Sequence, residues 1–288
     1  MPNVPMAFAS PLGVPRALTS ATAAAIAQAN LSDRLVQKPD LVVDPADWLA
    51  KDDQACAPPS LRTYLVHESP RLAVVPNFLT DSEVAHLLEL ARQSWAPSEV
   101  DDIVDERQPH AVAAQGILRR SAKHRTSDSY VLEEGQTETL RQIEKRLCHL
   151  VGMKLETLER LAMVKYAPGQ FFKVHHDGGY RPWTVFVYLN DLPAGAEGET
   201  HFPALQLRVT PRKGCAVMWP NSGPDGKADP RLVHQGLPPT TGMKFGVNCF
   251  FHEKPVRRPA LPCDEETDHT EEELEDEDSA QLGWNLCS

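Results

Sequence analysis

Two histidines and one aspartate are spaced so that their side chains could bind the same metal ion. His175 and Asp177 lie two residues apart in a short run that predicts a β-strand. Side chains at positions i and i+2 of a strand point to the same face, so both could reach one ion while His176 points away. Two ligands on one strand do not fix a metal alone, and His234, in a later predicted strand, is the candidate for the third. The pattern predicts a metal site built from two strands.

A lysine follows His234 at a spacing that strengthens this prediction. Lys244 lies ten residues later, between apolar neighbours of another predicted strand. An unpaired charge is costly to bury, and a dicarboxylate bound at the metal would supply the counter-ion. Two histidines and one carboxylate form the facial triad of non-haem Fe(II) oxygenases, which leaves metal positions open for such a ligand. Taken singly, His175 could be an ordinary core or surface histidine, and Lys244 could face outward from its strand.

Short strands and two helices are predicted to position these residues. Thr80 and Glu83 fit a capping box, and apolar residues at helical spacing follow to about residue 94. A second helix is predicted over 137–151. Strand-like runs, most of them bounded by Gly and Pro, are predicted at 71–75, 161–166, 171–177, 184–189, 205–210, 215–219, 232–235 and 245–252. Helices followed by many short strands predict a mainly β fold with supporting helices packed against a sandwich or barrel.

The sequence divides into an arm, a domain and a tail. Residues 1–65 are predicted to be a mostly disordered N-terminal arm, with a helical turn near residues 45–51. Residues 66–256 carry the predicted helices and strands and are expected to form one domain. Residues 257–288 are predicted to be a disordered tail, because 264–278 contain eleven acids and no Lys or Arg. This tail is interpreted either as a solvated segment or as a docking segment for a basic partner.

Charge and cysteine usage argue against several classes of protein. The chain has 40 acidic and 29 basic residues, so removing the eleven tail acids leaves 29 of each sign. A neutral body argues against nucleic-acid binding, which usually needs a basic stripe. No run approaches the roughly 18 apolar residues of a membrane helix. The six scattered Cys favour reduced thiols, so we expect a cytoplasmic protein, with an organelle transit peptide as the alternative.

Longer motifs around these residues resemble a known family. The stretch from Tyr166 to Asp177 resembles the Y-x-x-G-Q-x-x-x-x-H-x-D of the prolyl 4-hydroxylase catalytic-domain family of Fe(II)/2-oxoglutarate-dependent dioxygenases. Further matches are collinear with it: 125–127 resembles R-T-S, 188–191 Y-L-x-D, 198–203 G-E-T-x-F-P and 209–214 V-x-P-x-x-G. The resemblance spans roughly residues 69–254. Because the motifs are independent and occur in the same order, their combination is highly specific.

The resemblance implies a double-stranded β-helix, or jelly-roll, core with helices supporting one sheet. It implies Fe(II), 2-oxoglutarate, O2 and ascorbate as cofactors. The residues to which it assigns roles are the iron ligands His175, Asp177 and His234, the co-substrate residues Lys244, Tyr166 and Thr200, and Arg125 beside a peptide substrate. Tyr166 as a plain core residue, Thr200 as a strand residue and Arg125 as a surface charge are the alternatives.

One departure from the family pattern bears on the substrate. The family usually carries a lengthy loop after H-x-D, whereas here Gly178–Arg181 follow at once. The leading hypothesis is hydroxylation of prolyl residues in a proline-containing peptide or protein, with release of succinate and CO2. The short segment motivates an alternative, the same chemistry on another residue or on a small molecule. A third hypothesis is a non-catalytic binding module, which the intact ligand pattern disfavours.

Overall fold

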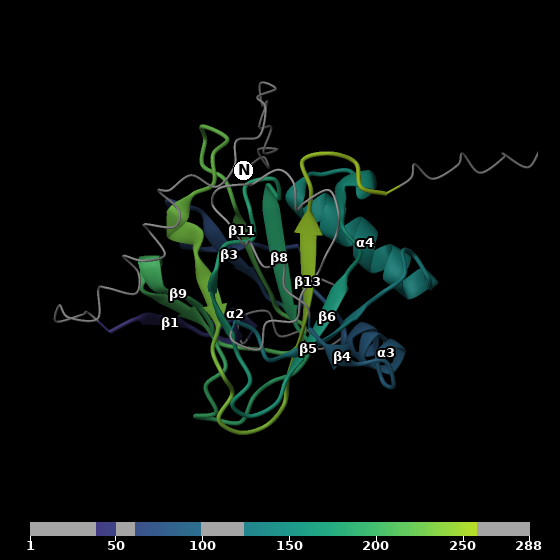
Figure 1. Ribbon diagram of the computed structural model, residues 1–288, viewed down its shortest axis with the longest axis horizontal. Coiled ribbons are helices and arrows are strands. Elements are labelled where there is room, and N and C mark those ends of the chain that lie inside the picture. The colour runs from purple at the N-terminus through teal and green to yellow at the C-terminus, as the bar shows by residue number, and fades with distance from the viewer. Residues whose placement is uncertain (1–38, 50–60, 99–123, 258–288) are drawn as a thin grey trace, which may run out of the picture. The chain divides into compact units, whose positions relative to one another are not determined.

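Two β-sheets, with helices on the outer face of the larger one, form the described part of the chain (Figure 1). The computed structural model describes residues 39–49, 61–98 and 124–257. The smaller sheet contains β1 (Leu41–Val43), β7 (Phe172–His175), β9 (Thr200–Phe202), β10 (Leu207–Val209) and β12 (His234–Gly236). Its strand order is β1-β10-β9-β12-β7.

The larger sheet has eight strands in the order β2-β3-β11-β8-β13-β6-β5-β4. They are β2 (Tyr64–His67), β3 (Leu72–Val75), β4 (Ala96–Pro97), β5 (Asp128–Val131), β6 (Ala162–Tyr166), β8 (Trp183–Tyr188), β11 (Ala216–Pro220) and β13 (Lys244–Phe251). The helices are α2 (Ala46–Leu49), α3 (Asp81–Leu90) and α4 (Glu138–Val151), with the 3-10 turns η2 (Leu155–Thr157), η3 (Pro203–Leu205) and η4 (Pro230–Leu232). The predicted fold, mainly β with supporting helices, is confirmed.

The eight-stranded sheet has a hydrophobic core on each of its faces. Val185 and Val187 of β8 pack in the same cluster as the buried residues of α3 and α4. Phe186 and Tyr188 of the same strand pack between the sheets with Trp219 of β11. This division follows from the strand period of two, which points successive side chains to opposite faces. The face between the sheets therefore receives the large aromatic residues that surround the candidate site.

The sequence around α3 and α4 explains where each helix starts. The Thr80 hydroxyl accepts from the Glu83 amide at 3.2 Å, and the Glu83 carboxylate accepts from the Thr80 amide at 2.9 Å, so the predicted capping box is present. α3 ends at Leu90, four residues before the predicted end. α4 follows its cap Thr137 and stops before Gly152, which has a φ of 71° and so takes the left-handed conformation that ends many helices. Its bounds agree with the predicted 137–151.

The smaller sheet includes a strand that the sequence did not predict. β1 runs parallel to β10, with Leu41 opposite Leu207 and Val43 opposite Val209. The Asp44 carboxylate accepts from Arg212 Nε at 2.7 Å and fastens this strand to the domain. β1 lies within the segment predicted to be a mostly disordered arm, so regular structure begins before residue 65, and α2 lies where a helical turn was predicted within that segment. The rest of that arm and the acidic tail lie outside the described residues.

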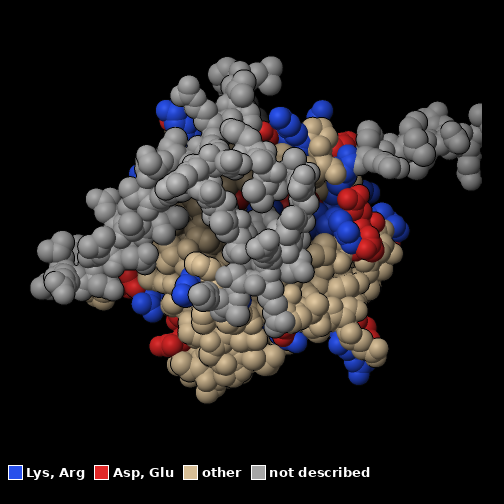
Figure 2. Space-filling model, viewed as in Figure 1, with Lys and Arg blue, Asp and Glu red and all other residues tan. Residues whose placement is uncertain are grey.

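The surface of the described residues carries charges of both signs. On the face shown in Figure 2, Lys and Arg side chains lie among Asp and Glu side chains around the margin, and the described residues in the lower middle of the view are mostly uncharged. Within residues 39–49, 61–98 and 124–257, no helix is long and apolar enough to cross a membrane.

Candidate metal and co-substrate site

The end of β7 and the start of β12 bring the predicted metal ligands together. His175, the last residue of β7, lies opposite His234, the first residue of β12, in an antiparallel pair. Asp177 lies two residues beyond the end of β7, so the strand is shorter than the predicted 171–177, and one ligand atom from each of the three residues lies within 4.8 Å of the others. His175 Nε2 is 3.6 Å from Asp177 Oδ1, and His234 Nε2 is 3.6 Å from Asp177 Oδ2. The three side chains can therefore reach one ion.

Backbone carbonyls set the orientation of both imidazole rings. His175 Nδ1 is 2.7 Å from the Lys173 carbonyl oxygen, and His234 Nδ1 is 3.0 Å from the Leu232 carbonyl oxygen. A carbonyl oxygen only accepts hydrogen bonds, so each Nδ1 carries the proton and each Nε2 presents a lone pair toward Asp177. Metal-binding histidines are commonly held in this way by their second nitrogen. The arrangement fits a metal ion with nitrogen and oxygen ligands.

His176, which lies between the candidate ligands His175 and Asp177, forms hydrogen bonds within the protein. The Gly178 amide donates to His176 Nδ1 at 3.0 Å, and His176 Nε2 donates to the Asp229 carbonyl oxygen at 3.1 Å. Both ring nitrogens are thus used within the protein, as expected for a side chain that points away from the ion. His176 ties the segment after β7 to the segment before η4.

The charges at the site are those that metal binding needs. Burial lowers the pKa of His175 to about 3, with the nearby His234 acting in the same direction. Burial acts to raise the pKa of Asp177, but the two histidines and a hydrogen bond from Thr184 outweigh it and hold that pKa below its ordinary value. Near neutral pH the imidazole of His175 is therefore neutral and Asp177 is charged. Metal ligands must be deprotonated in this way before an ion can bind.

Lys244 provides a buried positive charge on the face between the sheets. It begins β13, is 1% exposed, and its Nζ lies 5.3 Å from the centre of the Tyr166 ring and 5.8 Å from that of Tyr188. Within the described residues it has no ion pair or hydrogen bond. Burial lowers its pKa to about 7, although the charge of Glu199 acts in the opposite direction. A bound carboxylate would supply the missing counter-ion.

Two further hydroxyl groups face this space. Tyr166 pairs directly with Lys244 across β6 and β13, and its 4% exposed side chain has no hydrogen bond within the described residues. The Tyr188 hydroxyl donates to Thr200 Oγ1 at 2.8 Å, which leaves the Thr200 hydrogen free to donate to a ligand. Buried donors without acceptors are uncommon in folded proteins. Lys244, Tyr166 and Thr200 therefore fit the binding of a carboxylate.

Comparison with known proteins agrees with this geometry. Residues 161–252 match the 2OG-Fe(II) oxygenase superfamily. Prolyl 4-hydroxylase 5 of Arabidopsis thaliana is 32% identical over 212 residues, which cover 64% of this chain and 68% of that protein. The chain belongs to the prolyl 4-hydroxylase family. Probable prolyl 4-hydroxylase 8 of the same plant is 31% identical and is covered to 69% of its length, with 64% of this chain aligned.

The fold is also shared with a solved prolyl hydroxylase. The viral collagen prolyl hydroxylase of Paramecium Bursaria Chlorella virus-1, in its 2OG complex, aligns with a TM-score of 0.50 and 23% identity over 64% of this chain and 97% of that chain. As a member of this family, the chain is an Fe(II)- and 2-oxoglutarate-dependent dioxygenase with a jelly-roll core. The family and the fold that the sequence motifs implied are confirmed.

Arg125 is separated from the candidate ligand His175 by the ring of Phe172. Its guanidinium carbon is 4.6 Å from the centre of the Phe172 ring, and that ring stacks on His175 with 3.6 Å between centroids. Arg125 Nε donates to Ser127 Oγ at 2.7 Å, and Ser127 Oγ is 2.8 Å from Ser98 Oγ. The guanidinium is thus oriented beside the metal site and is not a free surface charge.

Sequence reasoning missed several residues that touch the candidate ligands. Phe172 stacks on His175, and the Trp219 ring lies edge-on to His234 with 4.8 Å between centroids. Thr184 Oγ1 donates to Asp177 Oδ2 at 2.7 Å. Trp219 and Thr184 are the last and first residues of predicted strands, so the available signal was their place at strand ends. A single sequence does not tell which strand ends meet.

The connection after β7 is short, as the sequence predicted, and is packed against the domain. Only residues 176–182 separate β7 from β8. Gly178 has a φ of 98°, and a Cβ there would lie 2.5 Å from the Tyr180 ring, so this turn requires glycine. Arg181 donates to both carboxylate oxygens of Glu159 at 2.7 and 2.8 Å. This bidentate pair holds the turn against the segment that follows α4.

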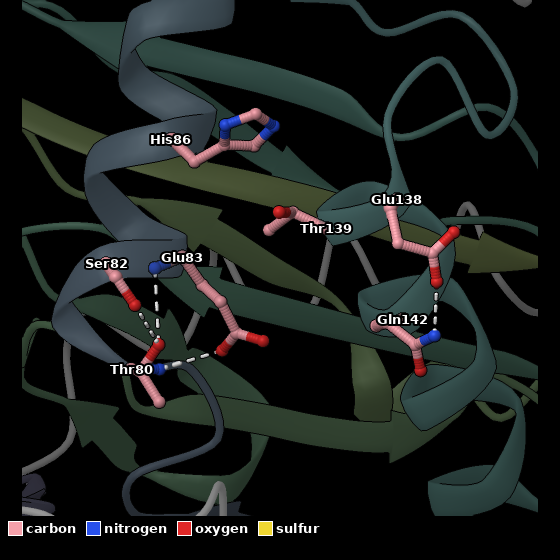
Figure 3. A pocket seen from close by; sticks show the side chains of 7 residues that line it. All are labelled: Thr80, Ser82, Glu83, His86, Glu138, Thr139 and Gln142. Atoms are coloured by element: carbon pink, nitrogen blue, oxygen red, sulfur yellow. Dashed lines mark hydrogen bonds between the residues drawn. The ribbon is translucent and has the colours of Figure 1, made fainter.

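A separate surface hollow lies where α3 and α4 begin, as Figure 3 shows. Its volume is about 400 Å³, and it is lined by Thr80, Ser82, Glu83, His86, Glu138, Thr139 and Gln142. The Glu83 carboxylate, which could bind a cation there, already accepts from Thr80 and forms an ion pair with Arg146 at 2.6 Å. The hollow contains none of the candidate ligands, and its main charged group is already used by the fold.

Proposed function

We propose that this dioxygenase hydroxylates prolyl residues of a peptide or protein substrate, with conversion of 2-oxoglutarate to succinate and CO2. The observation that carries the proposal is the convergence of three ligand atoms at one point, close to a buried lysine that has no counter-ion within the described residues. The family membership supplies the reaction class, and the names of its members supply proline as the substrate residue.

We propose a division of work among the residues of the site. His175 and His234 would hold Fe(II) through Nε2, and Asp177 would hold it through its charged carboxylate. Lys244 would bind the distal carboxylate of 2-oxoglutarate, with hydrogen bonds from Tyr166 and Thr200. The bound iron, together with 2-oxoglutarate and O2, supplies the oxidising chemistry for hydroxylation of a C–H bond, and the protein supplies binding, orientation and shielding from water.

Arg125 is proposed to contact the substrate. Its stacking on Phe172 places a cation beside the ring that covers His175, where a peptide reaching the metal would pass. A guanidinium has five donors and no acceptor, and among the described residues its only hydrogen bond is from Nε to Ser127. The remaining donors suit the carbonyl groups of a peptide backbone.

Mass spectrometry of proline-rich peptides tests the proposal. The full chain is incubated with the peptides, Fe(II), ascorbate, 2-oxoglutarate and O2, and succinate is assayed in parallel. We expect the mass of one oxygen to be gained on proline, and we expect His234→Ala to lose all detectable product because it removes one of three ligands. His86→Ala is the matched control, since its ring lies on α3 and contacts Thr137. Full turnover by His234→Ala would overturn the ligand assignment.

The short connection after β7 favours a second candidate, the same chemistry on another residue or on a small molecule. A turn held by Arg181 and Glu159 leaves less chain available to cover a peptide. Succinate formation without oxidation of any proline peptide would favour this candidate. Neither product, from protein that is shown to hold iron, would favour a non-catalytic binding role.

A basic partner for the acidic segment 264–278 is proposed separately. The support for it is the run of eleven acids without Lys or Arg, and a purely solvated tail is the competing interpretation. Deletion of 264–288 followed by pull-down with the full chain as reference tests it. If the deleted chain bound the same set of proteins as the full chain, the proposal of a basic partner would be wrong.

A further inference from the structure

We infer that a buried hydrogen-bond chain from Trp219 through Asn221 and Thr184 holds the Asp177 carboxylate in its metal-binding orientation. The inference rests on the proposed function, because it takes Asp177 as a metal ligand. Trp219 and Thr184 are 1% exposed, Asn221 is 0% exposed, and Asp177 is 7% exposed. Buried polar groups need hydrogen-bond partners. The side chains of Trp219, Asn221 and Thr184 obtain them by bonding to one another and to Asp177.

The chemistry of the groups fixes the direction of every hydrogen bond. An indole nitrogen can only donate, so Trp219 Nε1 donates to Asn221 Oδ1 at 3.1 Å. The Asn221 amide nitrogen must then face the other way, and it donates to Thr184 Oγ1 at 2.8 Å. Because that hydroxyl oxygen accepts from Asn221, its own hydrogen is directed to Asp177 Oδ2, 2.7 Å away. Trp219 thus orients the amide, and the amide orients the hydroxyl.

Asn221 is itself held in place by the backbone on both sides. Its second amide hydrogen is donated to the Arg181 carbonyl oxygen at 2.9 Å. Its backbone N–H donates to the Pro182 carbonyl oxygen at 3.0 Å, and its carbonyl oxygen accepts from the Asp229 amide at 3.0 Å. These bonds join the turn that carries Asp177 to the segment that leads into β12 and His234. Asn221 therefore relates the positions of two ligand-bearing segments.

Trp219 acts on a second ligand as well. Its ring meets the His234 imidazole edge-on, with centroids 4.8 Å apart, while its Nε1 is bonded to Asn221. Asp177 Oδ2, the oxygen that accepts from Thr184, is also the oxygen 3.6 Å from His234 Nε2. The hydroxyl prevents rotation of the carboxylate away from the histidines. Trp219, Asn221 and Thr184 are therefore positioning residues for the ion and do not touch the reacting atoms.

Binding of Co(II) to the metal-free full chain tests this inference, followed by visible absorption during a titration. Thr184→Val keeps the shape of the side chain but removes the hydroxyl, and we expect about 10- to 100-fold weaker binding, the usual effect of losing an outer partner of a metal ligand. Thr184→Ser restores the hydroxyl and should restore both the affinity and the absorption spectrum. Thr137→Val, which removes the cap of α4, lowers stability without contact with the site and should leave Co(II) binding unchanged.

Asp177→Ala separates a failure of this inference from a failure of the proposed function. If Asp177→Ala binds Co(II) as the parent does, the ligand assignment itself is wrong. If Asp177→Ala loses binding but Thr184→Val keeps the parent affinity and spectrum, only the positioning role is overturned. Should Thr184→Val not fold, Trp219→Phe takes its place, because it keeps an aromatic ring at this position and removes the donor to Asn221. Parent-like Co(II) affinity in Trp219→Phe would then overturn the inference.

Discussion

Replacing Lys244 with methionine is expected to raise the KM for 2-oxoglutarate by about 100-fold while making the protein more stable, because one buried charge serves binding and opposes folding. Lys244 is 1% exposed and forms no ion pair within the described residues. Burial lowers its pKa to about 7, against an ordinary value of 10.5. At about 1.4 kcal/mol for each pKa unit, this difference corresponds to roughly 5 kcal/mol when both states are protonated, so methionine should raise the free energy of unfolding by roughly 4 kcal/mol at pH 7.

Lys165→Met is the matched control for this substitution. Lys165 lies next to Tyr166 on β6 and opposite Phe245 of β13, and it forms a partly exposed ion pair with Asp128 at 3.2 Å. Such a pair contributes about 0–1 kcal/mol, so the control should change neither stability nor the KM for 2-oxoglutarate by much. Steady-state kinetics and urea unfolding measure the two effects. An unchanged KM in Lys244→Met would remove this lysine from the co-substrate site.

The same pKa predicts opposite pH trends for stability and for co-substrate affinity. Between pH 7 and 10.5 the unfolded chain binds a proton on Lys244 that the folded chain has lost, so stability rises with pH across this window. The stability advantage of Lys244→Met should therefore be full below pH 7 and disappear near pH 10.5. Binding of a dicarboxylate needs the charged lysine, so affinity should fall as pH rises above 7. Unfolding and 2-oxoglutarate titrations at pH 6–9 follow both trends, and parallel curves for parent and Lys244→Met would contradict them.

Local patterns were enough to select several candidate residues. The i, i+2 spacing of His175 and Asp177 indicated that their side chains meet, although β7 ends at His175 and Asp177 lies in the turn after it. The lysine at 244 was selected because it lies between apolar neighbours, whereas Tyr166, Thr200 and Arg125 were selected by the family motifs. The helix starts were equally predictable, because the capping box at Thr80 involves only residues three apart. Features whose cause lies within a few residues were therefore accessible from the sequence.

Features caused by distant partners were not predictable in this way. β1 has three residues, two of them exposed, and it exists because Leu41–Val43 pair with β10 more than 160 residues later. Thr200–Phe202 matched a family motif but gave no strand pattern of its own, since a run of three residues shows little period. Asn221 stands among Pro, Ser and Gly, as a turn residue would. Asn221 bonds to Thr184 because β8 pairs with β11, and this pairing could not be read from the residues around Asn221.

Breaking the buried ion pair between Glu144 and Arg257 is expected to cause a large loss of stability. Glu144 Oε1 is 2.9 Å from Arg257 Nη2, and the two side chains are 3% and 5% exposed. Arg257 also donates to the Leu158 and Glu159 carbonyl oxygens at 2.5 and 3.1 Å. Arg257→Met leaves the Glu144 carboxylate buried and unpaired, so we expect a loss of about 3–5 kcal/mol in the free energy of unfolding.

A variant that lacks both charges separates two contributions to the free energy of unfolding. One is the cost of leaving a single buried charge unpaired, and the other is the net contribution of the ion pair. Glu144→Leu combined with Arg257→Met removes both charges, and such replacements are often neutral or stabilising, so the double variant should be more stable than either single variant. Urea unfolding of the four proteins gives the coupling energy. Glu89→Ala, which breaks an exposed pair with Arg92, should cost less than about 1 kcal/mol. A similarly small cost for Arg257→Met would mean that the buried pair does not stabilise the fold.

The position of Arg257 also bears on where the domain ends. The sequence analysis ended the domain at residue 256 and began the tail at residue 257. In the structure, however, Arg257 is 8% exposed and forms an ion pair with Glu144 of α4. A chain shortened after residue 256 lacks the guanidinium and should unfold as readily as Arg257→Met. A chain shortened after residue 262 keeps it and should match the full chain. Equal stability of the two shortened chains would show that the domain does not need Arg257, since the acidic segment that begins at residue 264 is missing from both.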